Sequence, residues 1–234
     1  MNRPKAFIPT ATLVQVASLI AILHVLAPAP LAAQGRTVDA QLWSPTTVVK
    51  TVSDRWFVQA ETQVRLTEDF GKLSNSFLRP AVGIRVGRHA TVHLGYAWVP
   101  YFSPRRDEHR IWQQIAWSLP AGAWTLAPRL RLEQRWLPGA DGTTWRLRGQ
   151  LQVSHALSRS GAWRLSVADE LLVFLNDTRL GPDAGFGTNR VRIGFGHRLN
   201  RHVTIEPGYV LQFSHGRVQN EIVHAAIVST SLGF

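Results

Sequence analysis

The stretch from Trp124 to Trp136, WTLAPRLRLEQRW, constrains the fold of this chain more than any other part. Every second residue from Trp124 onward is uncharged and mostly apolar, and a tryptophan stands at each end. A period of two places alternate residues on opposite faces of a β-strand. The opposite face carries the charges, Arg129, Arg131, Glu133 and Arg135. The sequence therefore predicts a strand with one apolar and one charged face.

The length of this strand indicates the environment of its apolar face. Thirteen residues at about 3.3 Å each span about 40 Å, and a tilt near 40° reduces this to a height of roughly 30 Å. An outer-membrane barrel has an apolar band about 25 Å tall between two aromatic girdles. Strands of soluble folds are usually about 5–6 residues long. We therefore expect an all-β fold, a transmembrane antiparallel up-and-down β-barrel.

The same alternation recurs along the chain and bounds the number of strands. Ten regular segments lie between Trp56 and Phe234, and Val38–Lys50 is a weaker candidate interrupted by Pro45. Bacterial single-chain barrels have even strand numbers, so we expect about 10–12 strands. Ten would leave the segment 34–54 in the lumen or across its mouth. Twelve would make it a weak first strand that either splits at Pro45 or pairs with an unrecognised strand. Tryptophans recur at strand ends: Trp56, Trp98, Trp117, Trp124, Trp136, Trp145 and Trp163.

A soluble β-sandwich or a lipocalin-like barrel is the structural competitor, with its apolar side facing inward. Such a core would place the tryptophans centrally, whereas here they stand at strand ends. The connections also alternate between short and long. Short turns lie near Gly87, Pro120, Ser160 and Asn200, and longer polar segments include 68–74, 102–107, 138–143 and 176–185. Short periplasmic turns and long external loops are the outer-membrane rule.

The N-terminus predicts export. Arg3 and Lys5 precede an apolar run that ends in small residues at Ala33, which is typical of a cleaved signal peptide. We expect residues 1–33 to be the signal peptide, residues 34–234 to form the barrel, and the bacterial outer membrane to be its location in a Gram-negative envelope. Removal of Arg3 and Lys5 leaves 24 basic and 15 acidic residues, a formal charge of +9. Because the arginines alternate along strands of an exported chain, we expect no nucleic-acid partner.

Several short motifs together resemble the domain-of-unknown-function 2490 family. The motifs are Gln41-Leu42-Trp43, Leu78-Arg79-Pro80, Leu130–Arg135, Arg146-Leu147-Arg148, Asp169-Glu170, Asn189-Arg190, Gly208-Tyr209 and the terminal Phe234. The resemblance covers nearly all of the mature chain and implies an outer-membrane barrel without an established activity or catalytic residues. A terminal phenylalanine resembles the signal that the barrel-assembly machinery recognises. The implied partners are this machinery and outer-membrane lipid and lipopolysaccharide.

In such a barrel the charged faces line the lumen, where thirteen arginines outnumber six glutamates. The arginines are Arg65, Arg79, Arg85, Arg110, Arg129, Arg131, Arg135, Arg146, Arg148, Arg164, Arg190, Arg192 and Arg198, and the glutamates are Glu61, Glu108, Glu133, Glu170, Glu206 and Glu221. One hypothesis is a packed arginine–glutamate network that stiffens the barrel. The other is a porin-like passage or binding site for small anions, because the arginine fork suits carboxylate and phosphate. The number of strands lies between filled and open barrels. The candidate residues of this charge network are Arg129, Arg131, Glu133, Arg135, Arg146, Arg148, Arg164, Glu170, Arg190 and Arg192.

An outer-membrane lipid or peptide hydrolase with its site at the extracellular mouth is the alternative function. The adjacent pairs Ser154-His155 and Ser214-His215 cannot act directly as dyads, since neighbours on a strand point to opposite faces. Asp169-Glu170 meets the same objection, and Asp169 falls on the apolar face. No cysteine is present and the histidines lack metal-ligand spacing, so we expect no catalytic residue, metal or cofactor.

Overall fold

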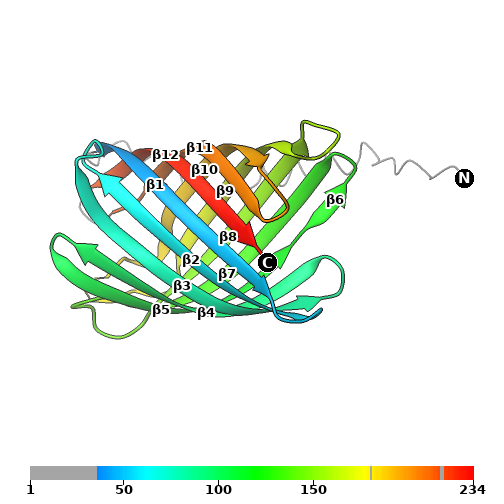
Figure 1. Ribbon diagram of the computed structural model, residues 1–234. Helices are drawn as coiled ribbons and strands as arrows, with labels where there is room; N and C mark the ends of the chain where they lie inside the picture. The colour runs from blue at the N-terminus through cyan, green and yellow to red at the C-terminus, as the bar shows by residue number, and fades with distance from the viewer. Residues whose placement is uncertain (1–35, 180, 217–218) are drawn as a thin grey trace, which may run out of the picture.

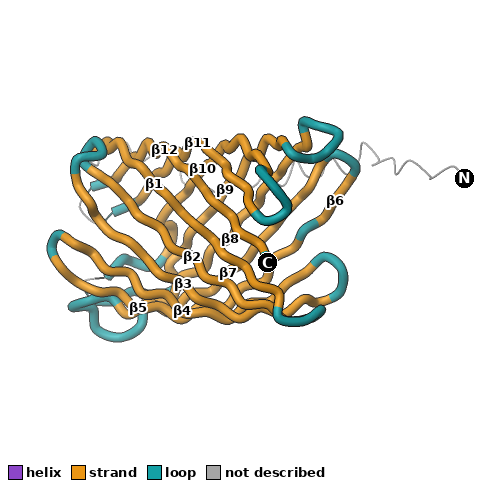
Figure 2. Tube along the Cα trace, viewed as in Figure 1, coloured by secondary structure: helices purple, strands orange, loops and turns teal. Residues whose placement is uncertain are grey.

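The computed structural model describes residues 36–179, 181–216 and 219–234. The expected signal peptide, residues 1–33, lies outside this part of the chain. Within it all regular structure is β-strand (Figure 2), and no helix is long and apolar enough to cross a membrane. The strands are β1 (Arg36–Thr51), β2 (Trp56–Thr67), β3 (Lys72–Val86), β4 (Ala90–Phe102), β5 (Arg105–Trp117), β6 (Leu119–Ala121), β7 (Trp124–Trp136), β8 (Thr144–Ala156), β9 (Trp163–Phe174), β10 (Gly185–Arg198), β11 (Val203–Ser214) and β12 (Asn220–Gly233).

The strands close into a barrel. Consecutive strands pair antiparallel, and β5 pairs directly with β7, while the three-residue β6 continues the line of β5 along β7. β1 and β12 close the sheet in parallel, from Arg36 opposite Asn220 to Val49 opposite Gly233. Figure 1 shows these two strands, blue and red, side by side. With β6 counted as part of β5, the described residues form a closed barrel of eleven strands.

Eleven strands lie within the expected 10–12 and the all-β barrel is confirmed, but two details of the expectation are wrong. The count is odd, and the closing pair is parallel, so the barrel is not antiparallel throughout. Both follow from β1, which is a full strand of 16 residues in the wall rather than a segment in the lumen. Pro45 obscured it in the sequence. The ladder to β12 skips Ser44 and Pro45, as expected where proline has no N–H to donate, and pairing resumes at Thr46.

The connections define two rims, which we name the tight-turn rim and the long-loop rim. The tight-turn rim carries the connections 52–55, 87–89, 122–123, 157–162 and 199–202 and the end of β12. The long-loop rim carries the start of β1 and the connections 68–71, 103–104, 137–143, 175–184 and 215–219. The expected loop at 102–107 is wrong, because β4 and β5 continue to Phe102 and Arg105 and only two residues turn between them.

The outer surface of the barrel is apolar, as the alternation predicted. Midway along the strands, Leu94, Val82 and Leu130 expose 59%, 48% and 48% of their surface. Tryptophans ring this band at both rims. Trp56, Trp124 and Trp163 lie toward the tight-turn rim, and Trp98, Trp136 and Trp145 lie toward the long-loop rim.

Eight polar residues of the outer face form four hydrogen-bonded pairs across neighbouring strands. Each of four pairs joins residues that stand diagonally, two positions out of direct register. The pairs are Tyr96 with His109, Gln113 with Gln134, Asp169 with Asn189, and Tyr209 with His224. Asp169 thus stands on the apolar face without a bulge of its own, and the Asn189 side-chain amide donates to it at 2.7 Å.

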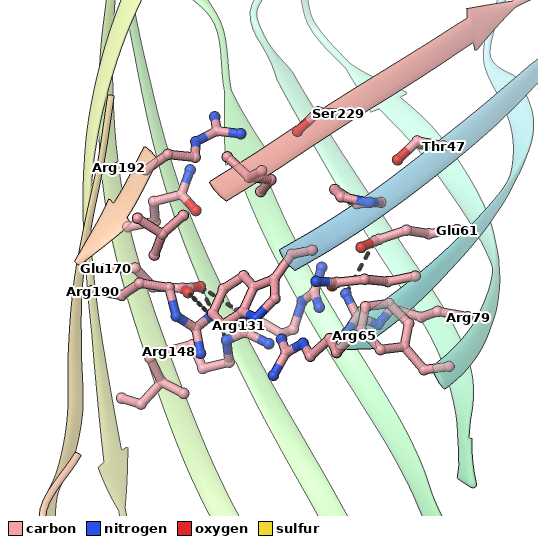
Figure 3. Close-up of a pocket in the computed structure, with 18 of the residues that line it drawn as sticks. Thr47, Glu61, Arg65, Arg79, Arg131, Arg148, Glu170, Arg190, Arg192 and Ser229 are labelled. Carbon is pink, nitrogen blue, oxygen red and sulfur yellow. Dashed lines mark hydrogen bonds and ion pairs between the residues drawn. The ribbon is translucent and has the colours of Figure 1, made fainter. Parts of the chain in front are cut away.

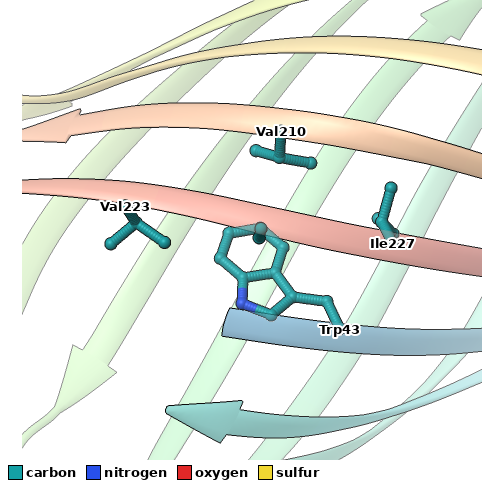
Figure 4. Close-up of a cluster of buried hydrophobic side chains, with 5 residues drawn as sticks. Trp43, Val210, Val223 and Ile227 are labelled. Carbon is teal, nitrogen blue, oxygen red and sulfur yellow. The ribbon is translucent and has the colours of Figure 1, made fainter. Parts of the chain in front are cut away.

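Apolar side chains also occupy two parts of the interior. One cluster lies along the seam of β1, β11 and β12, where Trp43 packs with Val210, Val223, Ala225 and Ile227 (Figure 4). The second lies on β3, β4 and β5 around Trp112, which is fully buried. Gly95 makes room for it, since a Cβ there would lie 2.3 Å from the Trp112 ring. Polar and charged side chains line most of the remaining interior.

Candidate functional site

The structure brings the ten candidate charge-network residues to the inner wall. On β7 and β8 they stand in register, with Arg131 opposite Arg148 and Glu133 opposite Arg146. Eight of the ten line one cavity, whereas Glu133 lies beneath its arginine partners and Arg164 lies toward the tight-turn rim. The inward face is therefore the one that the period of two predicted.

Two buried glutamates connect most of these arginines. Glu133 is 1% exposed and accepts hydrogen bonds from Arg146 and, at 3.0 Å, from Arg148. Glu170 accepts from Arg148 and Arg129 at 2.6 Å and from Arg190 at 3.0 Å. Arg148 thus bridges both carboxylates. Buried charges need such pairing, because desolvation of an isolated ion is costly.

Three further glutamates complete the network. Glu108 is fully buried and accepts from Arg110 and Arg135, each at 2.6 Å. Glu61 pairs with Arg79 at 3.0 Å. Glu206 pairs with Arg164 at 3.1 Å and lies 3.5 Å from Arg192.

Arginine is in excess inside the barrel. Five glutamates, Glu61, Glu108, Glu133, Glu170 and Glu206, face eleven arginines that line the cavity or bind one of them. The arginines are Arg65, Arg79, Arg110, Arg129, Arg131, Arg135, Arg146, Arg148, Arg164, Arg190 and Arg192. Arg85 and Arg198, which the sequence also assigned to the lumen, instead donate to backbone carbonyls at the tight-turn rim.

The charged network leaves a cavity of about 520 Å³ inside the barrel. Its lining reaches from Asn75 and Arg135, near the long-loop rim, to Gln59 and Ser231, near the tight-turn rim. Figure 3 shows arginines from opposite walls, among them Arg65, Arg131 and Arg190, converging on this space. The ion pairs therefore fill one side of the lumen, beside this cavity.

Aromatic rings support several of the arginines. The guanidinium carbon of Arg131 lies 4.3 Å from the Trp112 ring centre, and that of Arg79 lies 4.4 Å from Phe77. Trp43 is sandwiched, with Arg65 at 4.1 Å and Arg190 at 5.1 Å. Stacking on a ring stabilises a cation and fixes the plane of its guanidinium.

The sequence did not single out Trp43 as a lumen residue. Its position in phase with Gln41 and Asp39 on β1 could have indicated it, but Pro45 made that segment an uncertain strand. Arg65 was assigned to the charged face without a special role, because its lack of an acidic neighbour appears only when the strands are placed together.

The residue pairs considered for hydrolysis are separated in the structure. His155 packs against Trp124 on the outer face with the ring centres 4.4 Å apart, whereas the Ser154 hydroxyl accepts a hydrogen bond from Gln152. Asp169 and Glu170 point outward and inward, with separate partners. In the described ranges no group of three or more histidine, aspartate or glutamate side chains could hold a metal ion.

Fold and interior together define a closed β-barrel with a positively charged lumen. The family model described as "Protein of unknown function (DUF2490)" matches residues 40–222, and the chain belongs to this family, which confirms the resemblance seen in its motifs. An uncharacterized protein of Methylorubrum extorquens is 34% identical over 199 residues, which cover 83% of this chain and 87% of that protein. Among solved structures, a NanC porin is similar with a TM-score of 0.48 and 11% identity, covering 78% of this chain and 90% of that one.

Proposed function

We propose that this protein is an outer-membrane β-barrel whose arginine-rich lumen binds small anions and lets them pass. One observation carries the proposal. The cavity lining reaches from near one rim to near the other, and eleven arginines against five glutamates leave the lumen positive. Rings of one charge favour counter-ions in a pore.

The outer surface supports the membrane location. Exposed leucine, valine and isoleucine side chains cover the middle of the strands and tryptophans ring both rims, which is typical of outer-membrane barrels. The four hydrogen-bonded polar pairs fit this environment, because a polar group in hydrocarbon needs a partner within the protein. In water these pairs would need no such partners.

The membrane location is tested by fractionation and by gel migration. We expect the protein in the outer-membrane fraction, and we expect its unheated form to migrate differently from its boiled form, since a closed barrel resists detergent. A soluble fraction that migrates identically with and without heating contradicts the proposal.

The passage is tested by the reversal potential of the refolded barrel in a planar bilayer under a KCl gradient. We expect a small conductance that favours chloride over potassium. Arg192→Glu should shift the preference toward potassium, because Arg192 lines the cavity and Glu206 retains Arg164 as a partner. Arg159→Glu, in an exposed turn, makes the same change of charge outside the lumen and should leave the preference unchanged.

Two results contradict the passage. One is complete silence of correctly folded barrels. The other is an equal shift in the Arg192→Glu and Arg159→Glu variants, which would place the selectivity outside the lumen.

A further inference from the structure

Arg65 differs from the other ten lumen arginines. Each of those has a glutamate oxygen within 4 Å, although the Arg131 distance to Glu133 is a long 3.7 Å. Arg65 has no carboxylate at that distance and donates no side-chain hydrogen bond within the described part of the chain. Among these eleven arginines, Arg65 is therefore the one with no carboxylate oxygen within 4 Å in the described ranges.

Arg65 is nevertheless held in a fixed position. Its guanidinium lies 4.1 Å from the centre of the Trp43 ring, and Trp43 is 3% exposed. The Trp43 indole N–H donates to the Gln41 side-chain oxygen at 2.7 Å, and the Gln41 amide donates to Asp39 at 2.7 Å. This chain of hydrogen bonds orients the ring. A guanidinium stacked on a fixed ring keeps its N–H edge available for a bidentate partner.

Other unpartnered donors line the same cavity. Gln63 Nε2, Arg65 Nε, Arg129 Nε and Arg131 Nη1 are buried nitrogens without a hydrogen-bond acceptor among the described residues. Gln63 is 5% exposed and Arg131 is 2% exposed. Nearly all buried donors in proteins are satisfied, so several in one cavity indicate an acceptor that comes from outside the chain.

We propose that Arg65, with Gln63 beside it on β2, anchors a discrete binding site for the oxyanion group of a small polar solute. The group is a carboxylate or a phosphate, which accepts two parallel N–H donors, whereas chloride cannot. A cavity of about 520 Å³ admits a small metabolite. The inference rests on the proposed lumen function and deepens it, because it assigns anion binding to one site in addition to the general positive charge of the lumen.

The site is tested by the unfolding temperature of the refolded barrel in detergent. Sodium phosphate and sodium acetate are added separately, with sodium chloride at equal ionic strength as reference. A ligand that binds the folded state alone raises this temperature. We expect the wild-type protein to gain more from at least one oxyanion than from chloride, and Arg65→Gln to lose this gain.

Arg159→Gln is the matched control. It also removes one arginine, but Arg159 is exposed in the turn 157–162 and does not line the cavity. Its response should equal that of the wild type, which also accounts for general salt effects on the unfolding temperature. Arg65→Lys keeps the positive charge but lacks the two parallel N–H donors of the guanidinium. It should therefore keep only part of the rise in unfolding temperature.

The outcomes are distinct. A gain with phosphate alone, with acetate alone or with both identifies the oxyanion and supports the site if Arg65→Gln abolishes it. Equal responses of Arg65→Gln and Arg159→Gln, or no gain over chloride, overturn it. If the barrel conducts anions selectively but shows no Arg65-dependent rise in unfolding temperature, the binding site is wrong and the proposed passage stands. If the rise is present but the barrel does not conduct, the binding site stands and the passage is wrong.

Discussion

At the scale of single residues, charged side chains of the lumen differ in whether they have an ion-pair partner. Glu170 holds three arginines, whereas Arg65 stacks on Trp43 without a carboxylate. A buried charge without a partner lowers the stability of the fold. Removal of a buried charge that has several partners leaves those partners buried and unpaired, which also lowers stability. The two residues should therefore respond in opposite directions when their charge is removed.

Arg65→Met is expected to stabilise the barrel by about 1 kcal/mol, since it removes a desolvated cation and keeps apolar contact with Trp43. Equilibrium unfolding by urea in detergent micelles measures the change. A loss of stability would show that Arg65 is satisfied within the protein.

Glu170→Gln is expected to destabilise the barrel by about 3–5 kcal/mol, because Arg129, Arg148 and Arg190 lose their shared carboxylate. The same unfolding experiment measures it. Glu68→Gln is the control, since Glu68 pairs with Lys72 in solvent at the long-loop rim and should change nothing measurable.

At the scale of strands, the alternation predicted which residues face inward and outward, because a period of two leaves no other arrangement on a strand. It could not predict the diagonal hydrogen bonds of the outer face. Asp169 and Asn189 are twenty positions apart, and their contact depends on the register between β9 and β10, which shifts between Phe186 and Thr188.

The pair of Asp169 and Asn189 should be energetically coupled. In the proposed membrane location, each single change to alanine leaves the other polar side chain against lipid without a partner. We therefore expect the losses of stability of Asp169→Ala and Asn189→Ala to add up to more than the loss of the double variant. A coupling of about 0.6 kcal/mol is typical of hydrogen bonds in membranes. A double-mutant cycle on unfolding in lipid vesicles measures this coupling. If the two changes in the free energy of unfolding are additive, the cycle does not support the membrane location.

At the scale of the whole molecule, the sequence predicted a β-barrel, and the structure has one, with arginines of the predicted charged faces along its interior cavity. The exact strand number and the closing pair could not be predicted, because they depend on contacts between the first and last strands. The ion pairs join residues that the sequence named from their types and phase, and their role in binding anions stays a prediction. The role of Arg65 could not be predicted. It depends on the absence of a carboxylate near its guanidinium, which is known only when all eleven strands are in place.

The eleven strands also predict a topology that labelling can check. The chain has no cysteine, so a single introduced cysteine is unambiguous. Thr37→Cys, at the start of β1, should react with an impermeant maleimide on intact cells together with Gly142→Cys in a long loop. Arg159→Cys should react only after the outer membrane is permeabilised. Protection of Thr37→Cys on intact cells would contradict the parallel closure.

The parallel pair of β1 and β12 has a consequence for how relatives of this barrel can diverge. Gain or loss of a hairpin changes the number of strands by two and leaves β1 starting at the same rim. Gain or loss of one strand makes the closing pair antiparallel, and β1 then starts at the rim where β12 ends. Members of the family with odd and even counts would therefore present the beginning of their first strand to opposite sides of the membrane.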